Sequence, residues 1–403
     1  MFETPQKLWS GAPAWSARAG AVTTTFLTSG ISADVVIVGA GITGALLASA
    51  LSEAGLEVVI IDQRPPLQGS IRASTALLQY DLDQPLLKLT AQIGCDSAVQ
   101  AWQRSRLALD SLYGRINHLG IECDLRHRPS LLLAGNLLSA AEMDDEVRLR
   151  RAAGLYCSLL SSEALSREFE FRHTAAIHCQ GNFTADPILL TLGFLAHAQS
   201  LGAQIVAPEK VVEVVPGNRV LVKTSSFDVS CRYVVYATGY HVDPELLPEN
   251  SSLVGTYVMV TKPQPERLWR HESLIAEASS PYFYARTTSD GRIMCGGEDE
   301  IWHGKDHCEA KLSAKTKVLE EKLSQLFPLA DATAETSWCG AFGNSVTGLP
   351  TIGPIPGRQN CYGVFAFGGN GITFAAMAAD LITARLTGVT CPNDSLFGYT
   401  IRR

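Results

Sequence analysis

Apolar positions along this chain form short continuous runs that alternate with helical repeats. Residues 35–38 and 58–61 are uninterrupted apolar runs, which are typical of strands buried on both faces of a parallel sheet. The stretch between them is rich in Ala and Leu and predicts a helix that ends at Gly55. The order strand, helix, strand over residues 33–62 therefore predicts a βαβ unit.

Three glycines in G-x-G-x-x-G spacing lie where the first strand meets this helix. Gly39 permits the tight turn, Gly41 lets a pyrophosphate approach the backbone, and Gly44 lets the helix pack close to the strand. Asp62 stands at the carboxyl end of the second strand, where a carboxylate can accept both hydroxyls of an adenosine ribose. The combination predicts dinucleotide binding. A hairpin of structural glycine turns would explain neither the third glycine nor Asp62.

The remaining pattern predicts further helices and two groups of strands. Helical spacing is found over residues 95–118, 139–153 and 310–326. Asp186 followed by Pro187 marks the start of another helix, which Gly202 ends. Short strands are expected within residues 204–237 and 253–300, and a last strand over 363–366 precedes a glycine-rich loop and a helix to about residue 386.

These elements predict an α/β fold with two domains and an N-terminal arm. The first is a Rossmann-like domain with a central parallel sheet and a three-stranded crossover, assembled from three separate stretches of sequence. The second is a substrate domain with a mixed or antiparallel sheet and helices. The expected ranges are 1–32 for the surface arm, 33–80, 181–250 and 335–403 for the first domain, and 81–180 and 251–334 for the second.

Composition narrows the possible partners. Of the 403 residues, 46% are hydrophobic and 18% charged, which suits packed domains. The net charge of -7 and the lack of a basic stripe argue against nucleic acid, and no apolar run approaches the ~20 residues of a membrane span. The ten cysteines form no C-x-x-C pair, which favours reduced thiols and a cytoplasmic location. His303 and His307 lie in an expected loop, so no metal site is predicted.

Five motifs in order resemble one enzyme family. They are GAGITG with Asp62, GSIRAST from residue 69, VVYATGY from residue 234, WCGAFGNSVTGLPTIG from residue 338 and FAFGGNGITFAA from residue 365. The chain resembles the FAD-dependent oxidoreductases related to D-amino-acid oxidase, glycine oxidase, sarcosine oxidase and gamma-glutamylputrescine oxidoreductase. The series favours FAD over NAD(P), because an NAD dehydrogenase needs no terminal glycine loop and helix folded back onto the first sheet.

The resemblance implies which residues hold FAD. In relatives, the matching segments run beside the diphosphate, the adenine edge and the flavin, and the terminal helix points its N-terminus at the flavin pyrimidine edge, where it stabilises the reduced ring. An ordinary glycine turn is the alternative for GGNG. The implied cofactor-binding residues are Gly39, Ala40, Gly41, Ile42, Thr43, Gly44, Asp62, Gln63, Arg64, Gly69, Ser70, Ala73, Ser74, Thr75, Val211, Val212, Thr238, Gly239, Gly340, Gly368, Gly369, Asn370, Gly371 and Ile372.

The chain departs from its relatives at two places. The cysteine that binds flavin covalently in sarcosine-oxidase-like members falls on Gly340 here. Cys339 lies one residue away, so on a strand it would face the other side. We therefore expect non-covalent FAD. The arginine that pairs with the substrate carboxylate in glycine oxidase is missing, since Phe342 and Gly343 follow the W-x-G motif. A substrate carboxylate is then held elsewhere or is absent from the substrate.

The family reaction oxidises an amine or an amino acid. Hydride passes from the carbon next to nitrogen to flavin N5, an imine forms, and O2 or another acceptor reoxidises the flavin. Three alternatives stay open: an inert flavin-binding subunit of a larger assembly, an FAD dehydrogenase of a nitrogen-free substrate such as a 2-hydroxy acid, and an NAD(P) enzyme.

The catalytic candidates are Tyr257, Tyr284 and Arg286. Tyr282, Tyr284 and Arg286 fall on one strand face at period two. That face could line a pocket in which Arg286 grips a carboxylate and the tyrosines hydrogen-bond or surround an ammonium. An exposed strand face with ordinary aromatic packing is the alternative.

Overall fold

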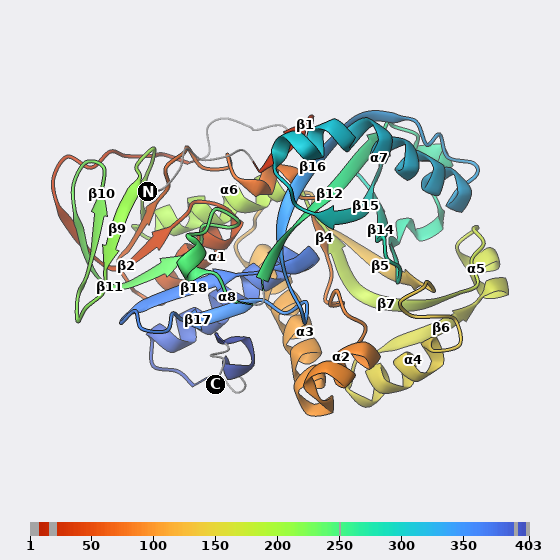
Figure 1. Cartoon of the computed structure of the whole chain (residues 1–403), viewed down its shortest axis with the longest axis horizontal. Helices are drawn as coiled ribbons and strands as arrows, with labels where there is room; N and C mark the ends of the chain where they lie inside the picture. Colours follow the sequence, from red (N-terminus) through yellow and green to blue (C-terminus); the bar gives the residue numbers. More distant parts are fainter. Residues whose placement is uncertain (1–7, 16–21, 250, 391–393, 400–403) are drawn as a thin grey trace.

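The computed structural model describes residues 8–15, 22–249, 251–390 and 394–399. In this part of the chain the strands form two sheets, one of eight strands and one of ten. Figure 1 shows the smaller sheet with its helices on the left and the larger sheet on the right. None of the helices in the described ranges is long and apolar enough to span a bilayer.

The smaller sheet is built around the predicted βαβ unit. Its order is β17-β18-β11-β2-β3-β8, and all neighbours are parallel except β17 and β18. Val35, Val36 and Ile37 are fully buried, because both faces of the sheet are covered. The strands are β2 (Ile31–Val38), β3 (Val58–Ile61), β8 (Gln204–Val206), β11 (Val229–Tyr236), β17 (Thr351–Pro354) and β18 (Cys361–Phe365).

Three helices cover one face of the smaller sheet and an antiparallel meander covers the other. The helices are α1 (Ile42–Glu53), α6 (Pro187–Ser200) and α8 (Gly371–Leu386), whose apolar side chains form one core with Val35 and Ile37. The meander consists of β9 (Val211–Val215), β10 (Val220–Thr224) and the first residues of β11. The predicted Rossmann-like sheet and its three-stranded crossover are confirmed.

The larger sheet is mixed, as predicted. Its order is β1-β16-β12-β15-β14-β13-β5-β7-β4 with β6 on β7, and only β13 and β5 pair in parallel. The strands are β1 (Trp9–Gly11), β4 (Leu77–Leu78), β5 (Arg126–Leu133), β6 (Cys157–Ser161), β7 (Ala175–Thr184), β12 (Ser251–Thr261), β13 (Leu274–Glu277), β14 (Phe283–Thr287), β15 (Ile293–Ile301) and β16 (Ala334–Ser345).

Of the remaining α-helices, α3 joins the two units and the others pack on or beside the larger sheet. α3 packs against α8 of the smaller unit, and α7 packs on the larger sheet. The α-helices are α2 (Leu86–Ile93), α3 (Cys95–His118), α4 (Met143–Ala152), α5 (Ser162–Glu168) and α7 (Lys305–Leu326). The 3-10 helices are η1 (Ser70–Ala73), η2 (Pro244–Leu246), η3 (Pro265–Arg267), η4 (Arg270–Glu272), η5 (Gly368–Asn370) and η6 (Asp394–Phe397).

Local capping confirms one predicted helix start and corrects two. Asp186 accepts hydrogen bonds from the backbone N–H groups of Ile188 and Leu189 in the first turn of α6, at 2.8 and 3.1 Å. α4 begins at Met143 and not near Ser139; a turn precedes it, in which the Glu142 carboxylate accepts from the backbone N–H and hydroxyl of Ser139. α7 begins at Lys305, so His307 lies in a helix and not in the expected loop.

Some strands cross the limits expected from the sequence. Residues 9–11 of the expected surface arm form β1, where Trp9 is buried and pairs with Gly340 of β16. β7 continues past residue 181, and β16 lies almost entirely beyond residue 335, yet both belong to the larger sheet. A pattern of apolar residues cannot show which sheet a strand joins, because either sheet buries the same side chains.

Candidate active site

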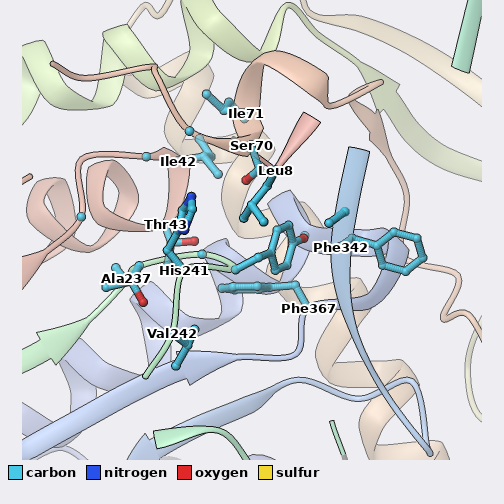
Figure 2. A pocket seen from close by; sticks show the side chains of 18 of the residues that line it. Leu8, Ile42, Thr43, Ser70, Ile71, Ala237, His241, Val242, Phe342 and Phe367 are labelled. Carbon is cyan, nitrogen blue, oxygen red and sulfur yellow. The ribbon is translucent and has the colours of Figure 1, made fainter. Parts of the chain in front are cut away.

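A cavity of about 1340 Å³ lies between the two sheets. It exceeds the ~300–1,000 Å³ of a usual small-ligand pocket, so it can take a long cofactor together with a substrate. Figure 2 shows Ile42 and Thr43 of α1, Ser70 and Ile71 of η1, and Phe342 of β16 around it. The lining therefore comes from the Rossmann-like unit and from the larger sheet.

The glycines between β2 and α1 form a backbone cradle. Gly39 has φ +118, and a Cβ there would lie 2.4 Å from the Ala237 carbonyl oxygen. A Cβ on Gly44 would lie 1.9 Å from the Gly39 carbonyl oxygen, which is why helix and strand pack so closely. Gly41 faces the cavity with nothing within 4 Å of its Cβ position. The open backbone and the N-terminus of α1 fit a diphosphate.

Asp62 stands at the end of β3 and lines the cavity. Its two carboxylate oxygens accept hydrogen bonds from the backbone N–H groups of Ala40, at 2.8 Å, and Arg64, at 2.9 Å. Burial raises its pKa, while these N–H groups and the Arg64 charge oppose the shift. The carboxylate is thus held rigidly where a ribose would present its hydroxyls.

The loop over residues 69–76 is fixed by side-chain donors that bond its backbone carbonyls. The Trp338 indole N–H donates to the Ala73 carbonyl at 3.0 Å, and the Trp15 indole N–H donates to the Ser74 carbonyl at 2.5 Å. The Arg286 guanidinium donates to the carbonyls of Thr75, at 2.8 Å, and Ala76, at 2.9 Å. The small side chains of the loop are therefore presented to the cavity.

Two cavity side chains from the Rossmann-like unit carry buried polar atoms without partners. The Thr238 hydroxyl and the Arg64 Nε make no hydrogen bond to any described residue. Nearby, burial and the Arg64 charge lower the pKa of His241 to about 4, so this imidazole is neutral near pH 7. Such unsatisfied donors are costly unless a ligand pairs with them, which fits a phosphate-bearing cofactor.

The C-terminal loop before α8 meets an acidic segment at the cavity. Gly368 has φ +59, and the backbone N–H of Gly369 donates to Asp83 at 2.8 Å. The Asn370 side chain donates to the Asp81 carbonyl at 2.6 Å. The carboxyl group of Asp83 faces the cavity while protein atoms crowd it from behind, and this burial raises its pKa to about 6. Residues 81–83 therefore shape the loop expected beside the flavin.

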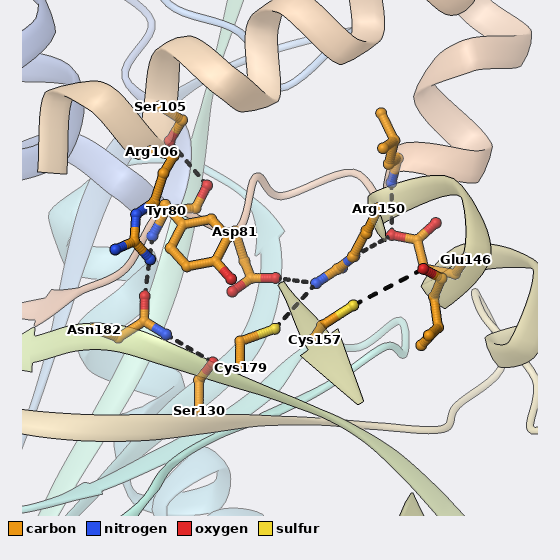
Figure 3. Close-up of polar contacts among 12 residues, drawn as sticks. Tyr80, Asp81, Ser105, Arg106, Ser130, Glu146, Arg150, Cys157, Cys179 and Asn182 are labelled. Atoms are coloured by element: carbon orange, nitrogen blue, oxygen red, sulfur yellow. Dashed lines mark hydrogen bonds and ion pairs between the residues drawn. The ribbon is translucent and has the colours of Figure 1, made fainter. Parts of the chain in front are cut away.

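A buried ion-pair network holds this acidic segment (Figure 3). Arg150 pairs with Asp81 and, at 2.7 Å, with Glu146. Glu146 also accepts from the first two backbone N–H groups of α2, at 2.9 and 2.6 Å. The guanidinium carbon of Arg150 lies 4.2 Å from the ring centroid of Trp102. The network ties the segment before α2 to α4, and through Asp81 to the C-terminal loop.

Most residues predicted to bind the cofactor converge on this cavity. Every one of them lines it except Gly44, which instead lets α1 pack against β2. Cys339 points away from the cavity toward Cys308, while Gly340 lines it. No cysteine is among the described residues of the lining, so none of them offers a thiol for covalent attachment.

Of the three catalytic candidates, one lines the cavity and two do not. Tyr284 lines the cavity together with Tyr282. Tyr257 points to the other face of β12, where it is fully buried and its hydroxyl donates to Glu300 at 2.6 Å. Arg286 is buried and bonds backbone carbonyls only, and this burial lowers its pKa to about 9. It is not placed to grip a carboxylate in the cavity, contrary to the expectation.

Several cavity residues were missed by sequence reasoning. Tyr240 and Phe367 belong to two of the quoted motifs but were not among the predicted site residues, whereas the others belong to none of the five motifs and only the folded chain brings them together. The missed residues are Asp83, Tyr240, His241, Leu253, Thr256, Asp299, Trp302, His303 and Phe367.

Comparisons with known proteins agree with this geometry. A family model described as DAO, FAD dependent oxidoreductase, matches residues 34–385. Gamma-glutamylputrescine oxidoreductase of Escherichia coli is 25% identical over 374 residues, covering 90% of this chain and 85% of the relative. D-amino acid dehydrogenase of Rhizobium johnstonii is 24% identical over 405 residues, covering 88% and 94%.

Solved structures share the fold. Glycine oxidase from Geobacillus kaustophilus superposes with a TM-score of 0.75 at 18% identity, covering 92% of this chain and 99% of that structure. L-proline dehydrogenase from P. horikoshii gives a TM-score of 0.75 at 16% identity, covering 91% and 96%. With the family model spanning most of the sequence, the chain belongs to the DAO family of FAD dependent oxidoreductases, and FAD is its cofactor.

Proposed function

We propose that this protein oxidises an amine by removing hydride from the carbon next to nitrogen. The observation that carries the proposal is one continuous cavity. It joins the glycine cradle and Asp62 to a wall of the larger sheet that bears Tyr282 and Tyr284. Bound FAD would supply the hydride acceptor. The substrate is left as an imine, which water hydrolyses, and O2 or another acceptor takes up the electrons.

The chain's own residues position the substrate and exclude water. The ring centroids of Tyr282 and Tyr284 lie 5.7 Å apart, and burial raises the pKa of both phenols. Both hydroxyls therefore stay neutral and can donate hydrogen bonds. Leu253, Trp302 and Phe342 add apolar surface to this part of the cavity. Alignment of a C–H bond in a dry pocket needs no dedicated base.

Anaerobic reduction of the flavin tests the proposal. The FAD-loaded protein is mixed without oxygen with a panel of primary and secondary amines, amino acids and 2-hydroxy acids, and the visible flavin absorbance is followed. We expect at least one amine to bleach the flavin while 2-hydroxy acids leave it oxidised. Bleaching by nitrogen-free compounds only would refute amine oxidation. A flavin that no compound reduces would favour the inert subunit.

We also propose that the protein works in a reducing compartment such as the cytoplasm. The nine described cysteines are all free thiols, and eight of them are buried. The test is whether the cysteines of the protein taken from cells are free or bridged. Free thiols would support the proposal, and disulfides in the isolated protein would contradict it.

A further inference from the structure

Two carboxyl groups face the substrate part of the cavity. Asp83 precedes α2, and Asp299 lies near the end of β15. Burial raises the pKa of Asp299, and the Asp83 charge helps to raise it further. Tyr282 lies in the connection between β13 and β14, and both carboxylates add to the rise in its pKa that burial causes. This acidic pair is the strongest polar feature of the cavity that binding of FAD leaves unexplained.

One carboxylate oxygen of Asp299 has no hydrogen-bond donor in the described part of the chain. The carboxyl group lies near the Thr256 hydroxyl, which donates to the Gly297 carbonyl at 3.4 Å. Its Oδ1 atom is buried and has no hydrogen-bond partner among the described residues. A buried acceptor left without a donor costs free energy that a bound ligand can restore. Asp83 differs in this respect, because it already accepts from the Gly369 backbone N–H.

No Lys or Arg of the described cavity lining pairs with these two carboxyl groups, and Lys315, whose charge also acts on Asp299, lies outside the lining and bonds Glu298. The Lys and Arg side chains among the described lining residues are Arg64, Lys210 and Arg358, and all three come from the Rossmann-like unit. Arg286 neighbours the tyrosines in sequence but bonds carbonyls behind the loop. A substrate with a carboxylate beside the reacting carbon would therefore meet two acidic groups and no partner.

The reacting nitrogen cannot be the cation that these groups hold. When hydride leaves the carbon, the nitrogen lone pair becomes the second bond of the C=N group, so that nitrogen must be neutral. A carboxylate beside it would favour its protonated, unreactive form. The cation that Asp83 and Asp299 bind must then be a second nitrogen of the same substrate. The tyrosine rings add favourable cation–π contacts for an ammonium.

We propose that Asp83 and Asp299 bind a distal ammonium group, so that the substrate is a diamine or polyamine without a carboxylate next to the reacting carbon. This inference rests on the proposed function, since it names the substrate of that reaction. It makes Asp299 the specificity-determining residue, because its unpaired oxygen has no structural duty. Asp83 has a second role in shaping the loop at Gly368 and Gly369.

The test compares probes of equal length. The FAD-loaded protein is titrated anaerobically with α,ω-diamines of two to six carbons, the matching n-alkylamines and the matching ω-amino acids. The flavin spectrum gives the dissociation constant and stopped-flow mixing gives the reduction rate. We expect the preferred diamine to bind at least about tenfold more tightly than its n-alkylamine, as one charge-assisted hydrogen bond allows, and the ω-amino acid to bind more weakly still.

Variants assign the effect to the cavity. Asp299→Asn should weaken diamine binding about tenfold and leave n-alkylamine binding unchanged, because only the distal ammonium uses this carboxylate. Asp83→Asn should act in the same direction, with the melting temperature measured to reveal any damage to the loop. Asp306→Asn, an exposed carboxylate outside the cavity lining, should change neither constant.

Two failures can be told apart. If no amine reduces the flavin, the proposed function is wrong, while the spectral titration still reports whether diamines bind through Asp299. If amines reduce the flavin but amino acids with an α-carboxylate bind more tightly than every diamine, the substrate inference is wrong. An unchanged ratio of diamine to n-alkylamine binding in Asp299→Asn would overturn it as well.

Discussion

Replacing Arg150 by Met should destabilise the protein through two buried acids. Arg150 and Glu146 are almost fully buried, and Asp81 is 13% exposed. Methionine keeps most of the volume but leaves both carboxylates without their cation. Removing one partner of a buried ion pair costs about 3–5 kcal/mol. The same change frees Asp81, whose carbonyl holds Asn370.

The expected loss can be converted into a melting temperature. With ~2.1 cal/mol/K of unfolding entropy per residue, a chain of 403 residues has about 0.85 kcal/mol/K. A loss of about 3–5 kcal/mol then lowers the midpoint by about 4–6 °C for one cooperative transition. Circular dichroism follows the unfolding, and flavin fluorescence follows cofactor release in the same sample.

A neighbouring arginine provides the matched control. Arg148 lies on the same helix, is 68% exposed and pairs only with the exposed Asp144 and Asp145. Arg148→Met should change stability by no more than about 0.5 kcal/mol, since surface ion pairs contribute little. Equal midpoints for Arg150→Met and Arg148→Met would refute the role given to the buried network.

Three further predictions follow from the cavity. Gly44→Ala should abolish FAD uptake, because the new Cβ would lie 1.9 Å from the Gly39 carbonyl oxygen. The control is Gly114→Ala on α3, whose Cβ would have no atom within 4 Å, and this variant should bind FAD normally. Burial raises the pKa of Asp299 from 3.8 to about 6, so the unfolded chain holds fewer protons between about pH 4 and pH 6 and the folded state loses stability as the pH rises through that range. Asp299→Asn should therefore melt higher than wild type at pH 8 without FAD and show no advantage at pH 4; the reverse order would contradict the burial of this group. Acid precipitation should leave a colourless pellet and all FAD in solution, and flavin retained in the pellet would disprove non-covalent binding.

The nucleotide-binding half was predictable because its chemistry is local. Gly39, Gly41, Gly44 and Asp62 lie within one βαβ unit, and their spacing forms a motif that can be read along the sequence, although the backbone that crowds Gly39 belongs to the distant Ala237. The Asp186 cap of α6 is local in the same sense. Such features are readable because the residues that form them lie close together along the chain.

The substrate side was less predictable because its contacts are distant. Strand alternation correctly brought Tyr282 and Tyr284 together, but it could not show that Arg286 would bond carbonyls of residues 75, 76 and 185. Alternation on β12 likewise could not say which face meets the cavity, and Tyr257 faces away. Asp83 and Asp299 carry no motif, and only the folded chain brings the loop before α2 and strand β15 to one cavity.

The central claim is that distant segments of this chain enclose one FAD molecule. A crystal structure of the protein with bound FAD tests it most directly. We predict the ribose hydroxyls on Asp62, the diphosphate at the N-terminus of α1, and the isoalloxazine beside Gly340 and the loop 368–372. A flavin bound elsewhere, or an FAD whose ring lies remote from loop 368–372, would contradict the account.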